Sequence, residues 1–373
     1  MKLVTVIGAR PQFVKAALVS RQFGLFGELK EILVNTGQHY DPLMSDAFLR
    51  DLGMKKPDYN LEVGSGSHGA QTARILEGTE AILMRERPDA VVVYGDTNST
   101  LGGALAAAKL HIPVVHVEAG LRSFNRRMPE ELNRIVTDHL SDLLLAPNEE
   151  AAARLCREGI PTARIQVVGD IMYDALLAHL SEAGKSSIAA QLGLKTREYV
   201  LCTVHRAENT DVPARLKNLL DAMTAVAREM PVVFPVHPRS RKAIESFGLN
   251  MNCGGRLKLI DPVGYFDMLA LERGAAVIAT DSGGVQKEAY FLQVPCVTLR
   301  NETEWSELIS SGWNLLAPPD GSVNIAETIL RSIGRRGYAN THFYGDGNAA
   351  VAICSAVRGL CDGSVSSPTR ICA

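Results

Sequence analysis

Short apolar segments of strand length alternate with longer segments of helical pattern along the 373-residue chain. Because successive parallel strands need a crossover connection, usually a helix, this alternation is typical of a doubly wound α/β sheet. The strand-like segments fall into two sets, separated by a polar, small-residue stretch at 181–189. We therefore expect two Rossmann-like units with a cleft between them. The segments are 3–7, 32–35, 90–94, 114–117, 143–146 and 165–168, and then 199–204, 232–236, 257–260, 275–280 and 296–299.

The chain length also favours two domains, at roughly 150 residues each. With 39 basic and 41 acidic side chains there is no excess charge to attract nucleic acid or an anionic membrane, so we expect a small-molecule ligand. No apolar segment has membrane-spanning length and no secretory pattern begins the chain, which predicts a cytoplasmic protein.

The seven cysteines are scattered, odd in number and without a C-x-x-C pair. This pattern predicts reduced thiols rather than a zinc site or a disulfide scaffold. Cys202 and Cys296 lie in apolar segments and are expected in the core.

The segment T-D-S-G-G-V-Q-K-E-A (280–289) joins an apolar strand to a helix through Ser282, Gly283 and Gly284. Glycines let a ligand approach the backbone, and the free N–H groups at a helix N-terminus favour an anion. Ligands of open α/β sheets bind beyond the carboxyl ends of strands, so this turn suits a phosphate. An ordinary strand-to-helix turn is the alternative.

Charged side chains also follow the expected strands of the first unit. Arg10 comes directly after the strand 3–7, with Lys15 about one helical turn later, and both could face a phosphate or carboxylate at the cleft or simply be surface cations. Asp96 and Glu118 follow the strands 90–94 and 114–117. Since consecutive strand ends share one edge of the sheet, we expect these carboxylates in one crevice.

Three further residues complete the candidate site. Glu130 follows Pro129 in the first turn of an expected helix, where acids are common for stability alone but can do chemistry if the helix end faces the cleft. His205 and His237 follow two strands of the second unit, each close to an arginine. Histidines in equivalent places suit recognition of a charged leaving group.

The segment G-S-G-S-H-G (64–69) matches the dinucleotide pattern G-x-G-x-x-G. That pattern belongs after the first strand of a βαβ unit, whereas residues 59–63 make a poor buried strand. We therefore expect no nicotinamide cofactor, and a mobile flap at this segment.

The chain resembles the non-hydrolysing UDP-N-acetylglucosamine 2-epimerases over nearly its whole length. The matching segments are G-A-R-P-Q (8–12), T-G-Q-H (36–39), Y-G-D-T-N-S-T (94–100), H-V-E-A-G-L-R (116–122), P-E-E-L-N-R (129–134), H-R-A-E-N (205–209) and the segment 280–289. The resemblance implies a GT-B-like fold, a homodimer and no metal or other cofactor. It implies an N-terminal domain at 1–170 with catalytic carboxylates, a UDP-binding domain at 171–345, a helix near 346–360 that crosses back to the first domain, and a flexible tail at 361–373.

The family's chemistry is removal of the C2 proton of the sugar while UDP leaves C1, followed by re-addition of UDP and return of the proton to the opposite face. By position, the resemblance implies catalytic roles for Asp96, Glu118, Glu130 and His205. It implies sugar-diphosphate contacts for Arg10 and Lys15, and UDP contacts for His237, Ser282, Gly283, Gly284 and Glu288. Which carboxylate is the base is left open; our hypothesis is that Glu118 and Asp96 lie nearest C2.

Departures from the family pattern bear on the substrate. Bacterial members regulated by UDP-N-acetylglucosamine usually carry Gln and Arg where this chain has Asp41 and Ala70, so the effector site does not carry over. The segments Q-K-E-A, V-G-Y (263–265) and E-T-E-W (302–305) look more like the branch acting on UDP-2,3-diacetamido-2,3-dideoxy-glucuronate. Its uronate would need a cation, for which the candidates are Arg122, Arg126, Arg127 and Arg134, although most could be ordinary surface arginines.

Two other classes of function remain open at this point. A GT-B glycosyltransferase would use the same UDP site with an acceptor groove and would not need the cluster of Asp96, Glu118 and Glu130. A UDP-sugar sensor would bind without turnover, but nothing in the sequence adds an effector domain for it.

Overall fold

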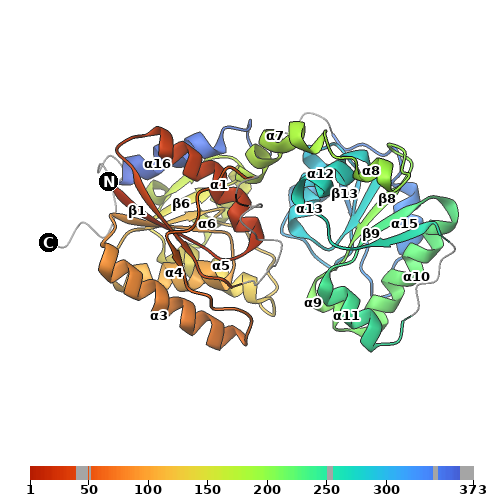
Figure 1. The fold of residues 1–373 in the computed structure, drawn as a ribbon, viewed down its shortest axis with the longest axis horizontal. Helices are drawn as coiled ribbons and strands as arrows, with labels where there is room; N and C mark the ends of the chain where they lie inside the picture. The colour runs from red at the N-terminus through yellow and green to blue at the C-terminus, as the bar shows by residue number, and fades with distance from the viewer. Residues whose placement is uncertain (39–48, 50–51, 250–254, 339–342, 362–373) are drawn as a thin grey trace. The chain divides into compact units, whose positions relative to one another are not determined.

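The computed structural model describes residues 1–38, 49, 52–249, 255–338 and 343–361. The chain divides into two compact units, the first formed by Met1–Ala175 with His342–Ala373 and the second by Leu176–Thr341. Each unit is an α/β layer structure around its own parallel sheet (Figure 1). The predicted α/β fold class is thus confirmed.

The sheet of unit 1 has the strand order β3-β2-β1-β4-β5-β6-β7, and every neighbouring pair is parallel. The order reverses at β1, so β1 and β4 flank the position where α/β sheets bind ligands. The strands are β1 (Lys2–Ile7), β2 (Lys30–Asn35), β3 (Tyr59–Asn60), β4 (Ala90–Tyr94), β5 (Val114–Val117), β6 (Leu143–Ala146) and β7 (Ile165–Val167).

Helices cover both faces of this sheet. α3 and α4 pack on each other and on the face that carries Val4, Val6, Val91 and Val93 (Figure 1). The continuous Val, Ile and Leu content of β4 and β6 fits strands that are buried on both faces. The described helices of unit 1 are α1 (Arg10–Leu25), α3 (His68–Glu86), α4 (Asn98–Lys109), α5 (Pro129–Leu140), α6 (Glu149–Arg157), the 3-10 turn η1 (Thr162–Arg164) and α16 (Ala349–Cys361), with α7 (Ile171–Ala183) crossing the boundary between the units.

The most C-terminal helix that the structure describes belongs to unit 1. α16 lies beside α1 (Figure 1), and the Arg358 guanidinium stacks 4.8 Å from the centre of the Phe26 ring. Its N-terminus is held by Asp174 of α7, whose carboxylate accepts hydrogen bonds from the backbone N–H groups of Ala349 and Ala350 at 3.1 and 2.8 Å. This acid satisfies donors that the first turn of a helix leaves without partners.

The sheet of unit 2 has the order β10-β9-β8-β11-β12-β13, again parallel throughout. Its edge strand β13 was not predicted. The strands are β8 (Val200–Thr203), β9 (Val232–Pro235), β10 (Leu257–Ile260), β11 (Val277–Thr280), β12 (Cys296–Thr298) and β13 (Asn314–Leu316). The helices are α8 (Ile188–Gln191), α9 (Ala207–Thr210), α10 (Pro213–Glu229), α11 (Pro238–Ser246), α12 (Tyr265–Gly274), α13 (Gly283–Phe291), α14 (Ser306–Ser310) and α15 (Ile325–Arg331).

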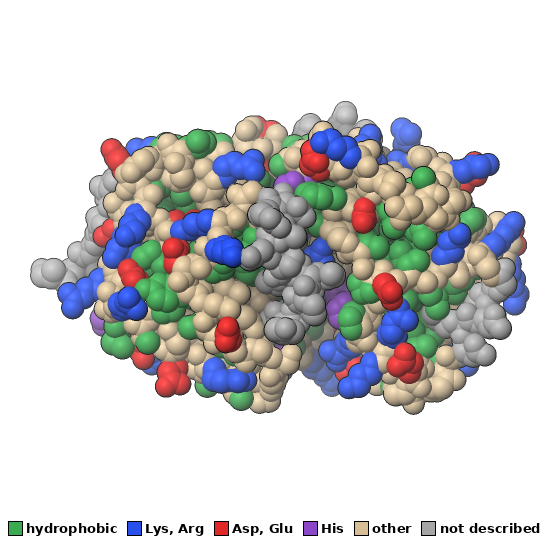
Figure 2. Space-filling model, in the orientation of Figure 1, with side chains coloured by type: hydrophobic (Ala, Val, Ile, Leu, Met, Phe, Trp, Pro, Cys, Tyr) green, Lys and Arg blue, Asp and Glu red, His purple; other side chains and the backbone are tan. Residues whose placement is uncertain are grey.

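Several smaller expectations can be compared with this structure. Cys202 and Cys296 are buried free thiols, as predicted. On the face shown in Figure 2, acidic and basic side chains are interspersed, which agrees with the small net charge. Asp41 and residues 362–373 of the expected tail lie outside the described residues. None of the helices that the structure describes is both long and apolar enough to cross a membrane.

Candidate active site

The turn after β1 is fixed by the tight packing of two side chains against Gly8. A Cβ atom on Gly8 would lie 2.0 Å from Thr36 Oγ1 and 2.2 Å from Ser99 Oγ, so only glycine fits. The buried Gln12 side chain accepts from Gly8 N–H at 2.8 Å and donates to the Tyr94 carbonyl at 2.8 Å. One amide thereby ties the exit of β1 to the exit of β4, where the candidate site begins.

Lys15 and Glu118 form a buried ion pair at the ends of β1 and β5. Arg10 is half-buried at the start of α1, and Lys15 projects from the next turn with 8% exposure. The Lys15 ammonium donates directly to Glu118 Oε2. Glu118 adopts the left-handed conformation, with φ of 71°, which is uncommon for a residue with a side chain and clusters at functional sites. Gly95 lies against this pair, because a Cβ there would be 3.3 Å from Glu118 Oε2 and 3.7 Å from Lys15 Nζ.

Asp96, at the end of β4, has a different cation. Its carboxylate accepts from Arg134 Nε at 2.9 Å and Nη2 at 2.7 Å, and its side chain is 31% exposed. Arg134 also donates to the buried Glu131 at 2.9 Å. Glu130, the preceding residue in the first turn of α5, is half-buried and has no hydrogen-bond or ion-pair partner among the described residues. The Glu131 carboxylate is therefore occupied by structural hydrogen bonds, whereas the Glu130 carboxylate is available to a substrate.

A buried polar network supports the loop that carries Asp96. His116 Nε2 lies 2.7 Å from the Gly95 carbonyl oxygen and Nδ1 lies 2.7 Å from Asp138 Oδ1, so the ring bridges the Gly95 turn and Asp138. Arg122 donates to Asp138 at 2.7 Å and holds Glu158 through two bonds of 2.9 and 2.6 Å. Although burial alone would raise it, the pKa of Asp138 is lowered by the hydrogen bonds and charges of His116 and Arg122. These hydrogen bonds connect buried side chains to the Gly95 carbonyl and so can fix the position of the Gly95–Asp96 turn.

In unit 2, the segment after β11 forms the expected turn into α13. Ser282 is the N-cap residue, and its hydroxyl faces the Val285 N–H at 3.5 Å. Gly283 and Gly284 open the helix, so their N–H groups are among the donors that a helix leaves available to a ligand. A Cβ on Gly283 would lie 3.5 Å from Trp305 Nε1 and 3.7 Å from an Arg206 nitrogen, which shows that two further donors border the turn.

The two predicted histidines of unit 2 lie next to each other. The ring centres of His205, after β8, and His237, after β9, are 5.5 Å apart. Asp281 is fully buried, and its carboxylate accepts from the backbone N–H groups of His205 at 3.1 Å and Arg206 at 3.0 Å and from Asn209 Nδ2 at 3.0 Å. Burial, supported by the nearby arginines and opposed by Asp281, lowers the pKa of His205, whose side chain is still 40% exposed. His205 is thus favoured as a neutral imidazole that a ligand can reach.

The cations near the turn are largely matched by acids. Arg300 is completely buried and donates to Glu304 at 2.8 and 3.2 Å, while Arg206 lies 3.6 Å from the same carboxylate. The Lys287 ammonium is buried and stacks 4.3 Å from the centre of the Trp305 ring. The residues that would meet a phosphate here are therefore the helix N–H groups and Arg206 rather than an open cluster of positive charge.

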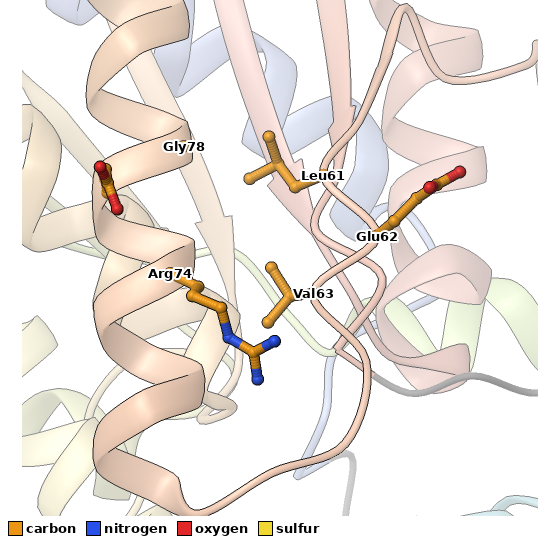
Figure 3. Close-up of a pocket in the computed structure, with 6 residues that line it drawn as sticks. Leu61, Glu62, Val63, Arg74 and Gly78 are labelled. Atoms are coloured by element: carbon orange, nitrogen blue, oxygen red, sulfur yellow. The ribbon is translucent and has the colours of Figure 1, made fainter.

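A surface hollow of about 250 Å³ lies elsewhere in unit 1, between residues 61–63 and α3. In Figure 3, Arg74 extends from α3 towards Val63, while the Glu62 carboxylate points away from the helix. None of the predicted site residues lines this hollow. We therefore do not assign it to the candidate active site.

The G-x-G-x-x-G segment has no dinucleotide-binding context. It follows β3, a two-residue strand at the edge of the sheet, and the Gly64 N–H donates to the Gly37 carbonyl at 2.9 Å. The place after the first strand is taken by the Gly8 turn. In the part of the chain that the structure describes, no group of three or more His, Cys, Asp or Glu side chains is placed to hold a metal ion.

Known proteins with similar sequences identify the family of this chain. The model of the UDP-N-acetylglucosamine 2-epimerase family matches residues 26–358. The chain is 49% identical over 367 residues to a UDP-N-acetylglucosamine 2-epimerase homolog of Methanococcus maripaludis, covering 96% of this chain and 100% of the relative. It is 46% identical over 357 residues to the UDP-2,3-diacetamido-2,3-dideoxy-D-glucuronate 2-epimerase of Pseudomonas aeruginosa, covering 95% and 98%. The chain belongs to the UDP-N-acetylglucosamine 2-epimerase family.

A solved member of this epimerase family has the same fold. The crystal structure of the UDP-GlcNAc 2-epimerase of Methanocaldococcus jannaschii in complex with UDP-GlcNAc and UDP matches with a TM-score of 0.89 at 40% identity, covering 96% of this chain and 99% of that one. The predicted family and the predicted GT-B-like fold are both confirmed. The catalytic and binding roles predicted for individual residues of the present chain stay predictions.

Two features of the epimerase site were not predicted from sequence. Asp281 stands inside the T-D-S-G-G segment, but no pattern indicated that its carboxylate would bind the backbone of the His205 loop. Arg122 and Arg134 were considered as uronate ligands or surface arginines, yet they are 2% and 4% exposed and are paired with acids. Arg126 and Arg127 are exposed and keep the surface interpretation.

Proposed function

We propose that this chain catalyses inversion at C2 of UDP-N-acetylglucosamine or a close derivative, through elimination and re-addition of UDP. The observation that carries the proposal is the arrangement at the ends of β4 and β5. Glu118 and Asp96 follow neighbouring strands, each carboxylate is held by its own cation, and Glu130 stands nearby on α5 without a partner among the described residues. The reaction needs a base on one face of the sugar and an acid on the other, and several carboxyl groups in different environments can supply both.

The proposed steps balance without an external reactant. One carboxylate, for which we favour Glu118, accepts the C2 proton while the C1–O bond breaks. The electron pair of the C1–O bond leaves with UDP, and that of the C2–H bond becomes the second bond between C1 and C2. A C1–C2 double bond forms, giving a 2-acetamidoglucal and UDP. Re-addition of UDP to C1, with a proton delivered to the opposite face of C2, yields the epimer. Asp96 is our second candidate near C2, while Glu130 and His205 assist proton transfer or departure of UDP.

Unit 2 suits the departing diphosphate. The N–H groups of Gly283 and Gly284, with Arg206 beside them, can accept the charge that develops on UDP. His237 and His205 border the ends of the neighbouring strands, and Glu288 follows Gly284 by one helical turn. We propose that Arg10 and Lys15 of unit 1 contact the sugar diphosphate. Lys15 would then replace part of its contact with Glu118 by a contact with the diphosphate. The two units would then be a catalytic and a UDP-binding domain.

The natural substrate is tested by offering UDP-N-acetylglucosamine and its 2,3-diacetamido-uronate relative separately and following epimer formation by proton NMR. Conversion of at least one to its manno epimer is expected. The 46% identity to the Pseudomonas aeruginosa enzyme makes the uronate a candidate substrate beside UDP-N-acetylglucosamine. Release of UDP with transfer of the sugar to an added acceptor, and no epimer, would instead support a GT-B glycosyltransferase.

We expect Gly283→Val to weaken UDP binding by about 5-fold to 150-fold, the range that corresponds to about 1–3 kcal/mol of overpacking. An alanine Cβ at this position would make only ordinary contacts with Trp305 and Arg206, but valine adds two methyl groups where those donors lie. Free glycal and UDP should therefore accumulate during turnover. UDP affinity is measured by calorimetry and glycal by NMR.

Gly284→Ala is the matched control, because its Cβ would approach only Ser282 Oγ, at 3.9 Å. This variant should bind UDP far more tightly than Gly283→Val. Equal affinity of both variants and the wild type would remove the turn from UDP retention.

We also propose, in line with the family, that the protein is a homodimer that works in the cytoplasm. Light scattering on the purified protein tests the first statement. A mass of one chain, near 40.3 kDa, at micromolar concentration would contradict it.

A further inference from the structure

A buried acid that the mechanism does not use lies at the end of α12. Glu272 is 0% exposed and sits in the last turn of that helix. The helix end is locked in place, because the Tyr199 hydroxyl donates to the Leu271 carbonyl at 2.5 Å and a Cβ on Gly274 would lie 2.5 Å from the same hydroxyl oxygen. Glu272 therefore has little freedom to turn towards solvent.

The environment of Glu272 favours the protonated, neutral form of its carboxyl group. Neither of its carboxyl oxygens has a hydrogen-bond donor among the described residues, and the carboxyl group that interacts with it is that of Glu288 on α13. Two ionised carboxylates are acceptors only and repel each other, so this buried pair can hydrogen-bond only when one of the two carries a proton. Burial, and then the charge of Glu288, raise the pKa of Glu272 well above its usual range. Glu272 is the partner that keeps the proton.

The other groups around Glu272 do not compete for this role. The titratable side chains that interact with it electrostatically are Tyr199 at β8 and Cys296 on β12. Burial raises the pKa of both, that of Cys296 to about 12, so both are neutral near pH 7. α8, which also packs on α12, has the sequence IAAQ and offers no titratable side chain, while His179 of α7 faces Tyr265 at the other end of α12.

Glu288 is the group on which this proton acts. It follows Gly284 by four residues on α13, so both lie on one face of the helix, with Glu288 one turn beyond the anion-binding turn. A nucleotide whose diphosphate meets the Gly283 and Gly284 N–H groups would bring its ribose towards that face. We propose that Glu272 is a positioning residue of the nucleotide site, which donates a hydrogen bond to Glu288 and holds that carboxylate ready to accept from the ribose hydroxyls. This inference rests on the proposed UDP site.

The experiment compares wild type, Glu272→Gln and Glu272→Met by calorimetry with UDP, 2′-deoxy-UDP and 3′-deoxy-UDP at pH 7.5. Wild type should bind UDP about 10-fold more tightly than at least one deoxy analogue, as expected for one hydrogen bond to a charged group. Glu272→Gln keeps a donor and should retain this preference. Glu272→Met fills the space without a donor, so the preference should fall below about 3-fold, with little change for the deoxy analogue.

A purely structural role for Glu272 gives a different pattern. Loss of affinity for all three nucleotides alike in Glu272→Met, or loss of the hydroxyl preference in Glu272→Gln as well, would overturn the inference. Absence of UDP binding by the wild type would instead contradict the proposed UDP site itself.

The pH dependence of stability tests the shared proton independently of any ligand. Above the usual pKa of a glutamic acid the folded protein retains a proton at Glu272 that the unfolded chain has lost, so this group makes stability fall as pH rises until the raised folded pKa is reached. We expect the melting temperature of wild type to decline more steeply than that of Glu272→Gln between pH 6 and pH 9. Parallel curves would overturn the inference.

Discussion

Glu118→Gln should slow exchange of the C2 proton of the UDP-sugar by about 1000-fold, within the range of 10² to 10⁴ that general acid–base catalysis contributes. The substitution keeps the size of the side chain and a hydrogen-bond acceptor for Lys15, but an amide does not accept a proton from carbon. Since the ion pair between Lys15 and Glu118 is buried, the variant also leaves the ammonium with a weaker partner, and some loss of stability is expected. The measurement is loss of the C2 proton signal in heavy water.

Glu62→Gln is the matched control for this change. Glu62 is also a left-handed glutamate, with φ of 50°, but it is exposed and borders the hollow next to α3. Exchange by this variant should stay within about twofold of wild type, as for most surface substitutions away from special features. Exchange by Glu118→Gln at the wild-type rate would remove Glu118 from the role of base.

Gly120→Ala should destabilise unit 1 by about 3 kcal/mol or more, even though it adds only a methyl group. Gly120 has φ of 82°, which costs an ordinary residue roughly 1–2 kcal/mol. Its Cβ would lie 2.5 Å from the Ala151 carbonyl oxygen and 2.9 Å from a Leu155 side-chain carbon. The first of these atoms is helix backbone, which does not move aside as a flexible side chain would, so overpacking adds about 1–3 kcal/mol. The midpoint of thermal or urea unfolding gives the change.

Gly159→Ala separates the two contributions. Gly159 has φ of 86°, yet nothing lies within 4 Å of its Cβ position, so only the conformational cost of roughly 1–2 kcal/mol applies. We expect Gly120→Ala to unfold clearly before Gly159→Ala. Coincident midpoints would show that the contact with Ala151 is not rigid.

The sequence predicted the strands well where they are buried on both faces. The segments 90–94, 114–117 and 143–146 agree with β4, β5 and β6 at both ends, because nearly continuous apolar runs mark strands covered by helices on both faces. The segment 257–260 also agrees with β10, although this strand lies at a sheet edge and is only partly buried. β13 was missed since its three residues, Asn314–Leu316, lack such a run and lie at the sheet edge. Edge strands receive less of the hydrophobic signal on which sequence patterns depend.

The sequence indicated which charged side chains follow the strands, but not how they pair. Asp96 and Glu118 follow neighbouring strands of one sheet, whose carboxyl ends meet at one edge, and His205 follows a strand of the other sheet. The partner of Glu118, however, is Lys15, 103 residues away, which we had expected to face a phosphate or carboxylate of the ligand or to be a surface cation. Such a partnership depends on the strand order, with β4 between β1 and β5, and no local pattern encodes it.

Buried acids show most clearly what only the structure supplies. From the sequence, Glu272 looks like one polar residue of an ordinary helix. Its side chain is 0% exposed because the end of α12 packs against Tyr199 and α13. Asp281 likewise accepts several hydrogen bonds from the His205 loop only because the end of β8 lies beside the end of β11. In both cases tertiary packing gives the side chain its chemistry.

The central claim is that this chain breaks the C2–H bond of a UDP-sugar during epimerisation. The direct measurement is deuterium content at C2, by proton NMR and mass spectrometry, after the wild-type protein has been incubated with its UDP-sugar in heavy water. Deuterium should appear at C2 of the newly formed epimer in every turnover, and with time at C2 of the recovered substrate. An epimer that retains the original C2 proton would contradict the account.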